Sequence, residues 1–372
     1  MPRELADHPE VLYGALVALV VVMLLTPAVG GMARLLGVVD LPDRRRLNVN
    51  PIPRLGGLAI FFGVFVPALA FLDLSGAWRG VLLGAAIATV VGAIDDFRAL
   101  GPWPKLAGQI IAAGVAVSFD VWIDRFTFPG LGIHELGPWV GIPLTLVWMV
   151  AIMNMVNFLD GLDGLAAGVC AIAGGTFAVI ALSVGRPQPA ILAAIVAGAC
   201  LGFLRHNFYP ARIFMGDSGA LCLGFLLAAL SVQGLLKTAS TVVLFWPLLV
   251  LAVPIIDTSF VVARRLKNRE RVFGADQAHL HHRFLRRGFT QRRAALTMWA
   301  WCATLAAAAL ATRFIPFRAG GVWHFWETLA AGAIGLAALA FSVYVVYLLE
   351  IVKLANPRVR RVEEAPRHRR SA

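Results

Sequence analysis

Residues 154–164 read NMVNFLDGLDG and place four polar side chains three residues apart in an apolar stretch: Asn154, Asn157, Asp160 and Asp163. On an α-helix each three-residue step turns by about 300°, so the four groups would cover half of the helix surface and face one common site. A charge at mid-bilayer costs roughly 2.5 to 3.5 kcal/mol on insertion scales, so these groups need a bundle interior or an aqueous border. The stretch therefore predicts a reaction site at the edge of an apolar bundle.

The composition of the whole chain predicts an all-α, polytopic integral membrane protein. The chain has 372 residues, of which 59% are hydrophobic, and it contains about eleven apolar segments of membrane-spanning length. These lie near residues 11–29, 56–73, 79–97, 105–120, 139–157, 164–184, 189–204, 219–236, 239–262, 296–315 and 326–352. The four cysteines all fall within apolar segments without metal or disulfide spacing, so we expect them to be packing residues.

The basic residues predict which loops face the cytoplasm. With eleven spans, 26 of the 33 Lys and Arg residues fall on the side that holds the odd-numbered loops and the C-terminus. The positive-inside rule makes that side cytoplasmic and places the N-terminus outside. We expect one transmembrane catalytic domain over residues 1–352, with active-site loops at 30–55, 95–105, 157–164, 205–218 and 263–295, and a basic cytoplasmic tail over 353–372. In this setting the net charge of +12 indicates orientation and contact with anionic lipid more than nucleic-acid binding.

Two adjacent carboxylates, Asp95 and Asp96, end the third apolar segment. Their mutual repulsion would be relieved by a divalent cation or by a cationic partner such as Lys105, although a solvated helix end would carry the same pair. Oxygen ligands without a cysteine cluster favour Mg²⁺ or Mn²⁺ over zinc.

A second polar group, residues 216–219 (GDSG), resembles the nucleophile motif of trypsin-like proteases, but it leads into an apolar helical run instead of a β-barrel. We reject the protease interpretation. Glycines at a helix start leave backbone N–H groups free for a phosphate, and Asp217 suits a metal that bridges to it.

The longest cytoplasmic loop carries His279, His281 and His282 behind a run of arginines that includes Arg265. Imidazole and guanidinium groups donate to phosphate oxygens, so the loop favours a polyanionic ligand. The alternative is an ordinary basic loop with incidental histidines. The first loop adds Arg54 within PIPRLGG, where prolines stiffen the chain and glycines permit close approach.

Five blocks together resemble the polyprenyl-phosphate N-acetylhexosamine-1-phosphate transferases. They are PIPRLGG at 51–57, Asp95 and Asp96 with Lys105 and Gln109, NMVNFLDGLDG at 154–164, GDSG at 216–219 and ADQAHLHHR at 275–283. The resemblance implies an enzyme of the inner membrane that moves a sugar 1-phosphate from a UDP-sugar to undecaprenyl or another polyprenyl phosphate. UMP would be released, Mg²⁺ or Mn²⁺ would be required, and the reaction would begin a cell-envelope polysaccharide such as lipopolysaccharide or teichoic acid.

The resemblance also implies roles for particular residues. Asp95, Asp96, Asp160 and Asp163 are the expected catalytic residues, and Asp217 would bind the metal with Asp95 and Asp96. The expected substrate-binding residues are Arg54, Lys105, Asn154, Asn157, Arg265, His279, His281 and His282.

Several alternatives remain open. The spacing of the histidines is similar to that of the GlcNAc branch, which favours UDP-GlcNAc, with phospho-MurNAc-pentapeptide transfer as the alternative. The attack could be direct or pass through an aspartyl intermediate, and the oligomeric state, with a homodimer as one option, is undetermined. A transporter or flippase would need ionisable residues at mid-membrane; the one deep candidate is Asp257, which could instead anchor Arg264 or Arg265.

Overall fold

The computed structural model describes residues 2–41, 51–128, 132–236, 245–269, 279–315, 318–319 and 322–349. The helices are α1 (Pro2–Asp7), α2 (Glu10–Leu35), α3 (Gly56–Phe71), α4 (Ala77–Phe97), α5 (Pro102–Ser118), α6 (Pro138–Leu159), α7 (Leu165–Ser183), α8 (Pro187–Asn207), α9 (Gly216–Leu230), the π-helix η1 (Ser231–Leu236), α10 (Phe245–Val250), α11 (Ala252–Lys267), α12 (Leu280–Arg286), α13 (Gln291–Phe314) and α14 (Phe325–Leu348). Proline in the first turn starts α5, α6 and α8, where the missing N–H is not needed.

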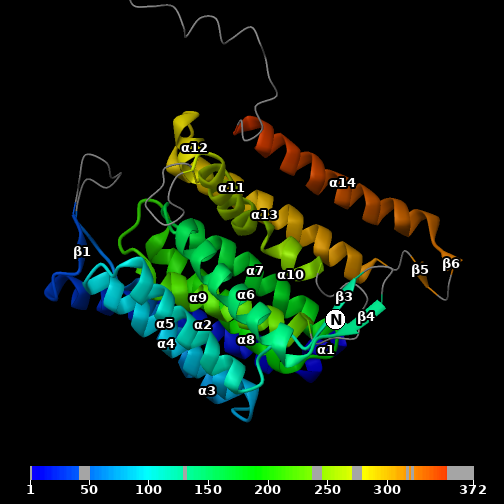
Figure 1. Ribbon diagram of the computed structural model, residues 1–372, viewed down its shortest axis with the longest axis horizontal. Helices are drawn as coiled ribbons and strands as arrows, with labels where there is room; N and C mark the ends of the chain where they lie inside the picture. Colours follow the sequence, from blue (N-terminus) through cyan, green and yellow to red (C-terminus); the bar gives the residue numbers. More distant parts are fainter. Residues whose placement is uncertain are drawn as a thin grey trace, which may run out of the picture.

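Within the described residues the strands form three short antiparallel pairs at the ends of helices. They pair β1 (Val39–Asp40) with β2 (Ile52–Pro53), β3 (Arg125–Phe128) with β4 (Gly132–Glu135), and β5 (Arg318–Ala319) with β6 (Val322–Trp323). The predicted all-α architecture is thereby confirmed (Figure 1).

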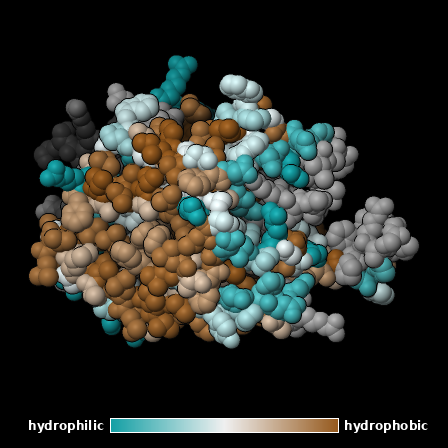
Figure 2. All heavy atoms as spheres, turned by 90° about the horizontal axis from the view of Figure 1, so that it is seen from below, coloured by the Kyte–Doolittle hydropathy of each residue, from teal (hydrophilic) through white to brown (hydrophobic). Residues whose placement is uncertain are grey.

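Eight helices in the described part of the chain are long and apolar enough to cross a membrane: α2, α4, α6, α7, α8, α13, α14, and α9 together with the start of η1. The protein is therefore a multi-pass membrane protein. Each of the eleven expected segments overlaps a helix, but α3 is a shorter apolar helix and the segment 239–262 is divided between α10 and α11. Figure 2 shows a broad field of hydrophobic residues bordered by hydrophilic ones, as a surface in contact with lipid requires.

Three of the expected cytoplasmic regions lie wholly or partly outside the described residues. They are the basic tail at 353–372, residues 42–50 of the first loop and residues 270–278 of the histidine loop.

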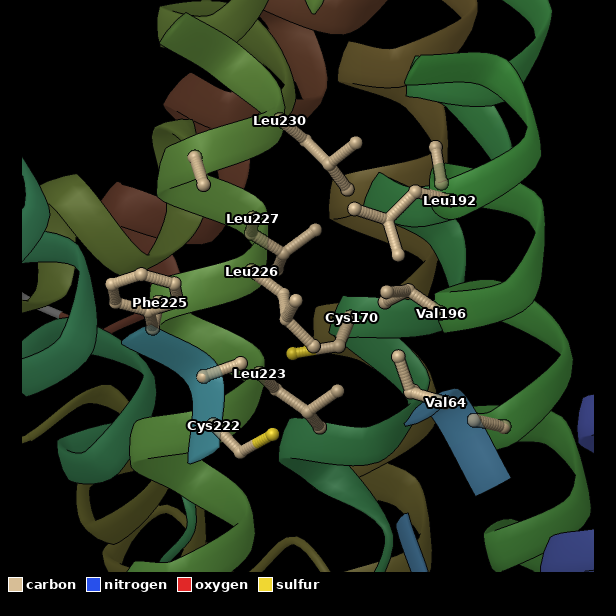
Figure 3. Close-up of a cluster of buried hydrophobic side chains, with 14 of the residues drawn as sticks. Val64, Cys170, Leu192, Val196, Cys222, Leu223, Phe225, Leu226, Leu227 and Leu230 are labelled. Atoms are coloured by element: carbon tan, nitrogen blue, oxygen red, sulfur yellow. The ribbon is translucent and has the colours of Figure 1, made fainter. Parts of the chain in front are cut away.

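Helix α9 forms the centre of the bundle. It packs against α3, α4 and α6, and nearly all of its side chains are buried. Cys170 of α7 and Cys222 of α9 lie among its leucines (Figure 3). All four cysteines are buried and free, which confirms their predicted role in packing.

Two glycines allow neighbouring helices to approach the start of α9 closely. A Cβ atom on Gly57 of α3 would overlap the backbone of Gly219, and one on Gly92 of α4 would overlap the backbone of Asp217 and Ser218. Both overlaps are with main-chain atoms, which cannot move aside as a flexible side chain can. Glycine at these two positions therefore brings α3 and α4 to the start of α9, where the site lies.

The connections at one end of the bundle are joined by hydrogen bonds. Phe214 N donates to Pro53 O at 2.9 Å, and Gly56 N donates to Phe214 O at 3.0 Å. Ala211 N donates to the Asp163 carboxylate at 2.9 Å. The loop before α3, the α6–α7 turn and the α8–α9 connection therefore meet at this end of the bundle.

A second apolar core attaches the C-terminal helices to this end. Leu159, Leu162 and Leu165 pack with Phe284 of α12 and with α13. The histidines of α12 are thereby held over the turn that follows α6.

Candidate active site

The sequence predicted that the four polar groups of residues 154–164 share one helix, and this prediction is wrong. Helix α6 ends at Leu159, so Asn154 and Asn157 are helical whereas Asp160 and Asp163 lie in the following turn. Gly164 completes that turn with φ of +74°, a conformation that favours glycine, and α7 begins at the next residue.

Lys105 lies at the centre of the acidic cluster. Its ammonium nitrogen is 3.2 Å from Asp95 Oδ2 and also donates to Asp217 Oδ2. With the Asn157 amide oriented to satisfy both neighbours, its oxygen accepts from Lys105 at 3.0 Å and its nitrogen donates to Asp217 Oδ1 at 3.2 Å. Four helices, α4, α5, α6 and α9, each contribute one side chain to this arrangement, and Lys105 fills the expected role of cationic partner.

Asp96, the neighbour of Asp95, has a different environment. Its Oδ1 accepts from Asp217 N at 2.9 Å, and its Oδ2 accepts from Ser218 N at 3.0 Å and Ser218 Oγ at 2.8 Å. Arg54 approaches the same carboxylate at 3.6 Å. The carboxylate of Asp96 thus occupies the N-terminus of α9, so the expectation that these N–H groups are free for a substrate phosphate is wrong.

Replacing Asp96 with asparagine is expected to destabilise the protein by about 1–3 kcal/mol, because the amide cannot accept all of the hydrogen bonds now made by the carboxylate. The change should appear as a lower unfolding temperature of the purified protein in detergent. Asp95→Asn, which leaves the α9 terminus intact, is the matched control. Equal unfolding temperatures for the two variants would contradict this role of Asp96.

Asn154, which was expected to bind substrate, is paired with a neighbouring helix. Its side-chain nitrogen donates to Gln109 Oε1 at 2.8 Å and to Val150 O at 2.8 Å, and its oxygen accepts from Gln109 Nε2 at 3.3 Å. Gln109 is buried and lies one turn beyond Lys105 on α5. Gln109 belongs to one of the five sequence blocks but was given no role there, and its four-residue spacing from Lys105 puts both side chains on one face of α5.

The two carboxylates of the turn have separate environments. Asp163 accepts from Ala211 N at 2.9 Å and so joins the turn to the α8–α9 connection; burial raises its pKa above the usual range. Burial raises the pKa of Asp160 to about 7, and the negative charges of Asp217 and Asp96 add to the effect. Asp160 is therefore the carboxylate of the turn that is electrostatically coupled to the acidic cluster.

The histidines pack against the same turn. His279 lies 5.3 Å from the ring of Phe158, and His281 stacks on His279 at 5.8 Å with nearly parallel rings. The ring of His281 fills the space that a side chain on Gly161 would need. Burial lowers the pKa of His281 well below its ordinary value, so this ring is neutral near pH 7.

The remaining predicted residues are His282 and Arg265. His282 contacts His281, with ring centroids 4.2 Å apart. Arg265 is buried on α11. Asp257, also on α11, accepts from His279 Nδ1 and from Leu280 N, a pairing that the sequence did not suggest.

The oxygen atoms around Lys105 are suitable for a hard divalent cation. In the described part of the chain no three His, Cys, Asp or Glu side chains form a ready metal-binding group. Oxygens of Asp95, Asp217 and Asn157 nevertheless already surround a cation, the Lys105 ammonium. An all-oxygen donor set of this kind fits Mg²⁺ or Mn²⁺.

Comparison with known proteins identifies the family. The model of glycosyl transferase family 4 matches residues 78–235. A probable undecaprenyl-phosphate N-acetylglucosaminyl 1-phosphate transferase of Bacillus subtilis (strain 168) is 40% identical over 290 residues, which cover 76% of this chain and 80% of that protein. The chain belongs to glycosyl transferase family 4. The matched range includes Asp95, Lys105, Asn157 and Asp217, so the central cluster lies within the part that defines the family.

Other members of glycosyl transferase family 4 resemble the chain over most of its length. Decaprenyl-phosphate N-acetylglucosaminephosphotransferase of Mycobacterium leprae is 36% identical over 338 residues, 82% of this chain and 85% of that protein. Phospho-N-acetylmuramoyl-pentapeptide-transferase of Desulforudis audaxviator is 37% identical over 297 residues, 72% of this chain and 86% of that protein. The resemblance carried by the sequence blocks is thus confirmed.

Proposed function

We propose that this family 4 protein transfers GlcNAc 1-phosphate from UDP-GlcNAc to undecaprenyl or another polyprenyl phosphate and releases UMP. The names of the Bacillus and Mycobacterium relatives support this activity. The structural observation that carries the proposal is the convergence of Asp95, Asp217 and Asn157 on one cationic position at the end of a membrane bundle. The product would begin the synthesis of a cell-envelope polysaccharide.

The acceptor supplies its own nucleophile. A phosphate monoester has a second pKa of about 6, so the lipid phosphate is largely dianionic at about pH 7. Its oxygen attacks the β-phosphorus of the UDP-sugar, a new P–O bond forms, and the bond from that phosphorus to the bridging oxygen breaks and releases UMP. The protein must therefore bring two anions together more than it must activate a nucleophile.

The cluster contains the residues needed for this task. Asp95, Asp217 and Asn157 would hold a Mg²⁺ or Mn²⁺ ion, which supplies charge neutralisation to the diphosphate. Lys105 provides a second positive charge within the same cluster, and Arg54 lies beside Asp96. Asp96 holds α9 in place, and with it the Asp217 carboxylate.

We favour direct in-line attack over an aspartyl intermediate. The oxygens of Asp96 are engaged by backbone N–H groups, which makes this carboxylate a poor nucleophile. Asp95 and Asp217 remain as candidates for the two-step route. A burst of UMP from UDP-GlcNAc in the absence of lipid acceptor would demonstrate a covalent intermediate and overturn direct attack.

The site is proposed to open to the cytoplasm, with the N-terminus outside and the protein in the plasma membrane. The proposal rests on the distribution of Lys and Arg among the loops. A membrane-impermeant thiol reagent should label a cysteine placed at Arg98 only in inverted vesicles. Labelling of that cysteine from the outside of intact cells would reverse the orientation.

Release of UMP by the purified protein tests the activity. We expect release that requires both undecaprenyl phosphate and Mg²⁺, with UDP-GlcNAc as the preferred donor. Because one relative is a pentapeptide transferase, UDP-MurNAc-pentapeptide should be compared directly. Preference for UDP-MurNAc-pentapeptide would make it the proposed donor in place of UDP-GlcNAc. Absence of UMP release from any UDP-hexosamine would favour the alternative that the protein is a transporter or flippase.

The pH profile should report the ionisation of Asp160. Its pKa of about 7 means that the carboxyl is mostly protonated below this pH and mostly ionised above it. If the ionised form contacts the donor substrate or the cation, kcat/KM rises between about pH 6 and about pH 8. This rise in kcat/KM should disappear in Asp160→Asn and persist in Asp163→Asn. An unchanged rise in Asp160→Asn would show that the ionisation of Asp160 is not its cause.

A further inference from the structure

Asp257 is a buried carboxylate that the proposed chemistry does not use. It lies on α11, is only 1% exposed, and accepts two hydrogen bonds from the start of α12. Oδ2 accepts from His279 Nδ1 at 3.0 Å, and Oδ1 accepts from Leu280 N at 2.8 Å. A carboxylate so enclosed is costly unless both of its oxygens are paired, and both are.

The first hydrogen bond selects one nitrogen of His279. A carboxylate accepts only, so the Nδ1 atom of His279 must carry the proton that points at Asp257. Nε2 is then the ring nitrogen left for a ligand. The second hydrogen bond, to Leu280 N, fixes the backbone from which the ring projects, so that neither the tautomer nor the ring position can change independently.

His279 transmits this constraint to the α6–α7 turn. Its ring contacts Phe158, the last residue but one of α6, and stacks on the ring of His281. His281 in turn packs directly on Gly161, which follows Asp160. Contacts therefore run without a gap from Asp257 through two histidines to the turn beside the acidic cluster.

We propose that Asp257 is a positioning residue for sugar-phosphate transfer, which acts by fixing the tautomer and orientation of His279 and, through it, the seating of His281 on Gly161. The inference rests on the proposed function, because it assigns His279 to the diphosphate or sugar of the UDP-sugar donor. Asp257 itself touches no substrate in this scheme.

Kinetics of the full-length protein in detergent would test the proposal, with UDP-GlcNAc, undecaprenyl phosphate and Mg²⁺ supplied. Partners that orient a functional histidine contribute about 10- to 100-fold in related settings, so kcat/KM for UDP-GlcNAc should fall by that factor in Asp257→Asn. Most of the loss should appear in KM for UDP-GlcNAc, while KM for undecaprenyl phosphate stays unchanged. Asp257→Glu, which keeps the acceptor, should recover part of the loss.

Four further variants separate positioning from general damage. His279→Gln combined with Asp257→Asn should be no worse than His279→Gln alone, since both changes remove one interaction. Gly161→Ala, which displaces His281 without touching Asp257, should raise the same KM. Thr258→Ala is the matched control, because this neighbouring hydroxyl has no hydrogen-bond partner among the described residues and its loss should alter neither constant.

The possible failures are distinguishable. Absence of UMP release from the wild-type protein would refute the proposed function itself. An active wild type with Asp257→Asn indistinguishable from Thr258→Ala would refute the positioning role, as would losses that multiply in the double variant. A lower unfolding temperature in Asp257→Asn with unchanged KM would assign Asp257 to stability alone and would also overturn the proposal.

Discussion

Asp217→Asn is expected to reduce kcat for UMP release by roughly 10²- to 10³-fold, the loss typical when one preorganised electrostatic group is removed from a reacting site. Asp217 is the carboxylate that contacts both Lys105 and Asn157, and an amide of the same shape cannot replace its negative charge. Measurements at saturating UDP-GlcNAc and undecaprenyl phosphate, repeated over a range of Mg²⁺ concentrations, would show the loss and a weaker response to Mg²⁺.

Asp73→Asn is the control for this variant. Asp73 follows α3 and is exposed, where it pairs with Ser75, so the same chemical change there should leave kcat unaltered. Asp217→Asn should also have the unfolding temperature of the wild type, because the backbone of α9 is held by the Asp96 carboxylate and not by the Asp217 side chain. A near-normal kcat in Asp217→Asn would show that the Asp217 carboxylate does not contribute to the reaction.

Gly92→Ala should damage both stability and activity. The added methyl group would overlap the Asp217 carbonyl and the Ser218 Cα, so α4 must move away from α9. Overpacking of this kind costs about 1–3 kcal/mol and sometimes more. Because Asp95 lies one turn along α4, its carboxylate would also move relative to Asp217, and a displacement of about 1 Å can reduce a rate about 10²-fold.

Gly114→Ala provides the comparison, because no atom of the described residues outside its own stretch of α5 backbone lies within 4 Å of the position that its Cβ would take. Alanine in an open helical position should stabilise α5 by up to about 1 kcal/mol. Thermal unfolding and UMP release should therefore separate the two variants clearly. If Gly92→Ala matched Gly114→Ala in both measurements, close contact between α4 and α9 could not be what positions the cluster.

The acidic residues show which features of the candidate site a local sequence pattern can predict. Asp95, Lys105 and Asp217 were recognised as site residues, and the structure does bring them together. Asp96 looked equivalent to Asp95, yet a helix residue points about 100° away from its neighbour, so Asp96 meets α9 while Asp95 meets Lys105. Asn154 and Asn157 share one face of α6, so the sequence predicted the same role for both. Asn154 lies one turn earlier in the helix, however, and pairs there with Gln109.

The parts of this protein that depend on neighbours in sequence could be predicted without a structure. Long apolar runs define helices that bury their backbone hydrogen bonds in lipid, and the spacing of the five motif blocks identified the family. The same stretch at 154–164 supplies side chains to the polar cluster around Lys105, although it does not remain helical beyond Leu159.

The pairing of the polar side chains could be determined only from the tertiary structure. Asp96 is 121 residues from Asp217 in the chain, and Asp257 is 22 residues from His279. Nothing in the local sequence states which donor a buried carboxylate will meet, because that is settled by how closely helices pack. Here the close packing depends on Gly57, Gly92 and Gly161, where the absence of a side chain admits a backbone or a ring. Tertiary packing therefore divides chemically similar aspartates between those that pair with the backbone at the start of α9 and those that pair with Lys105.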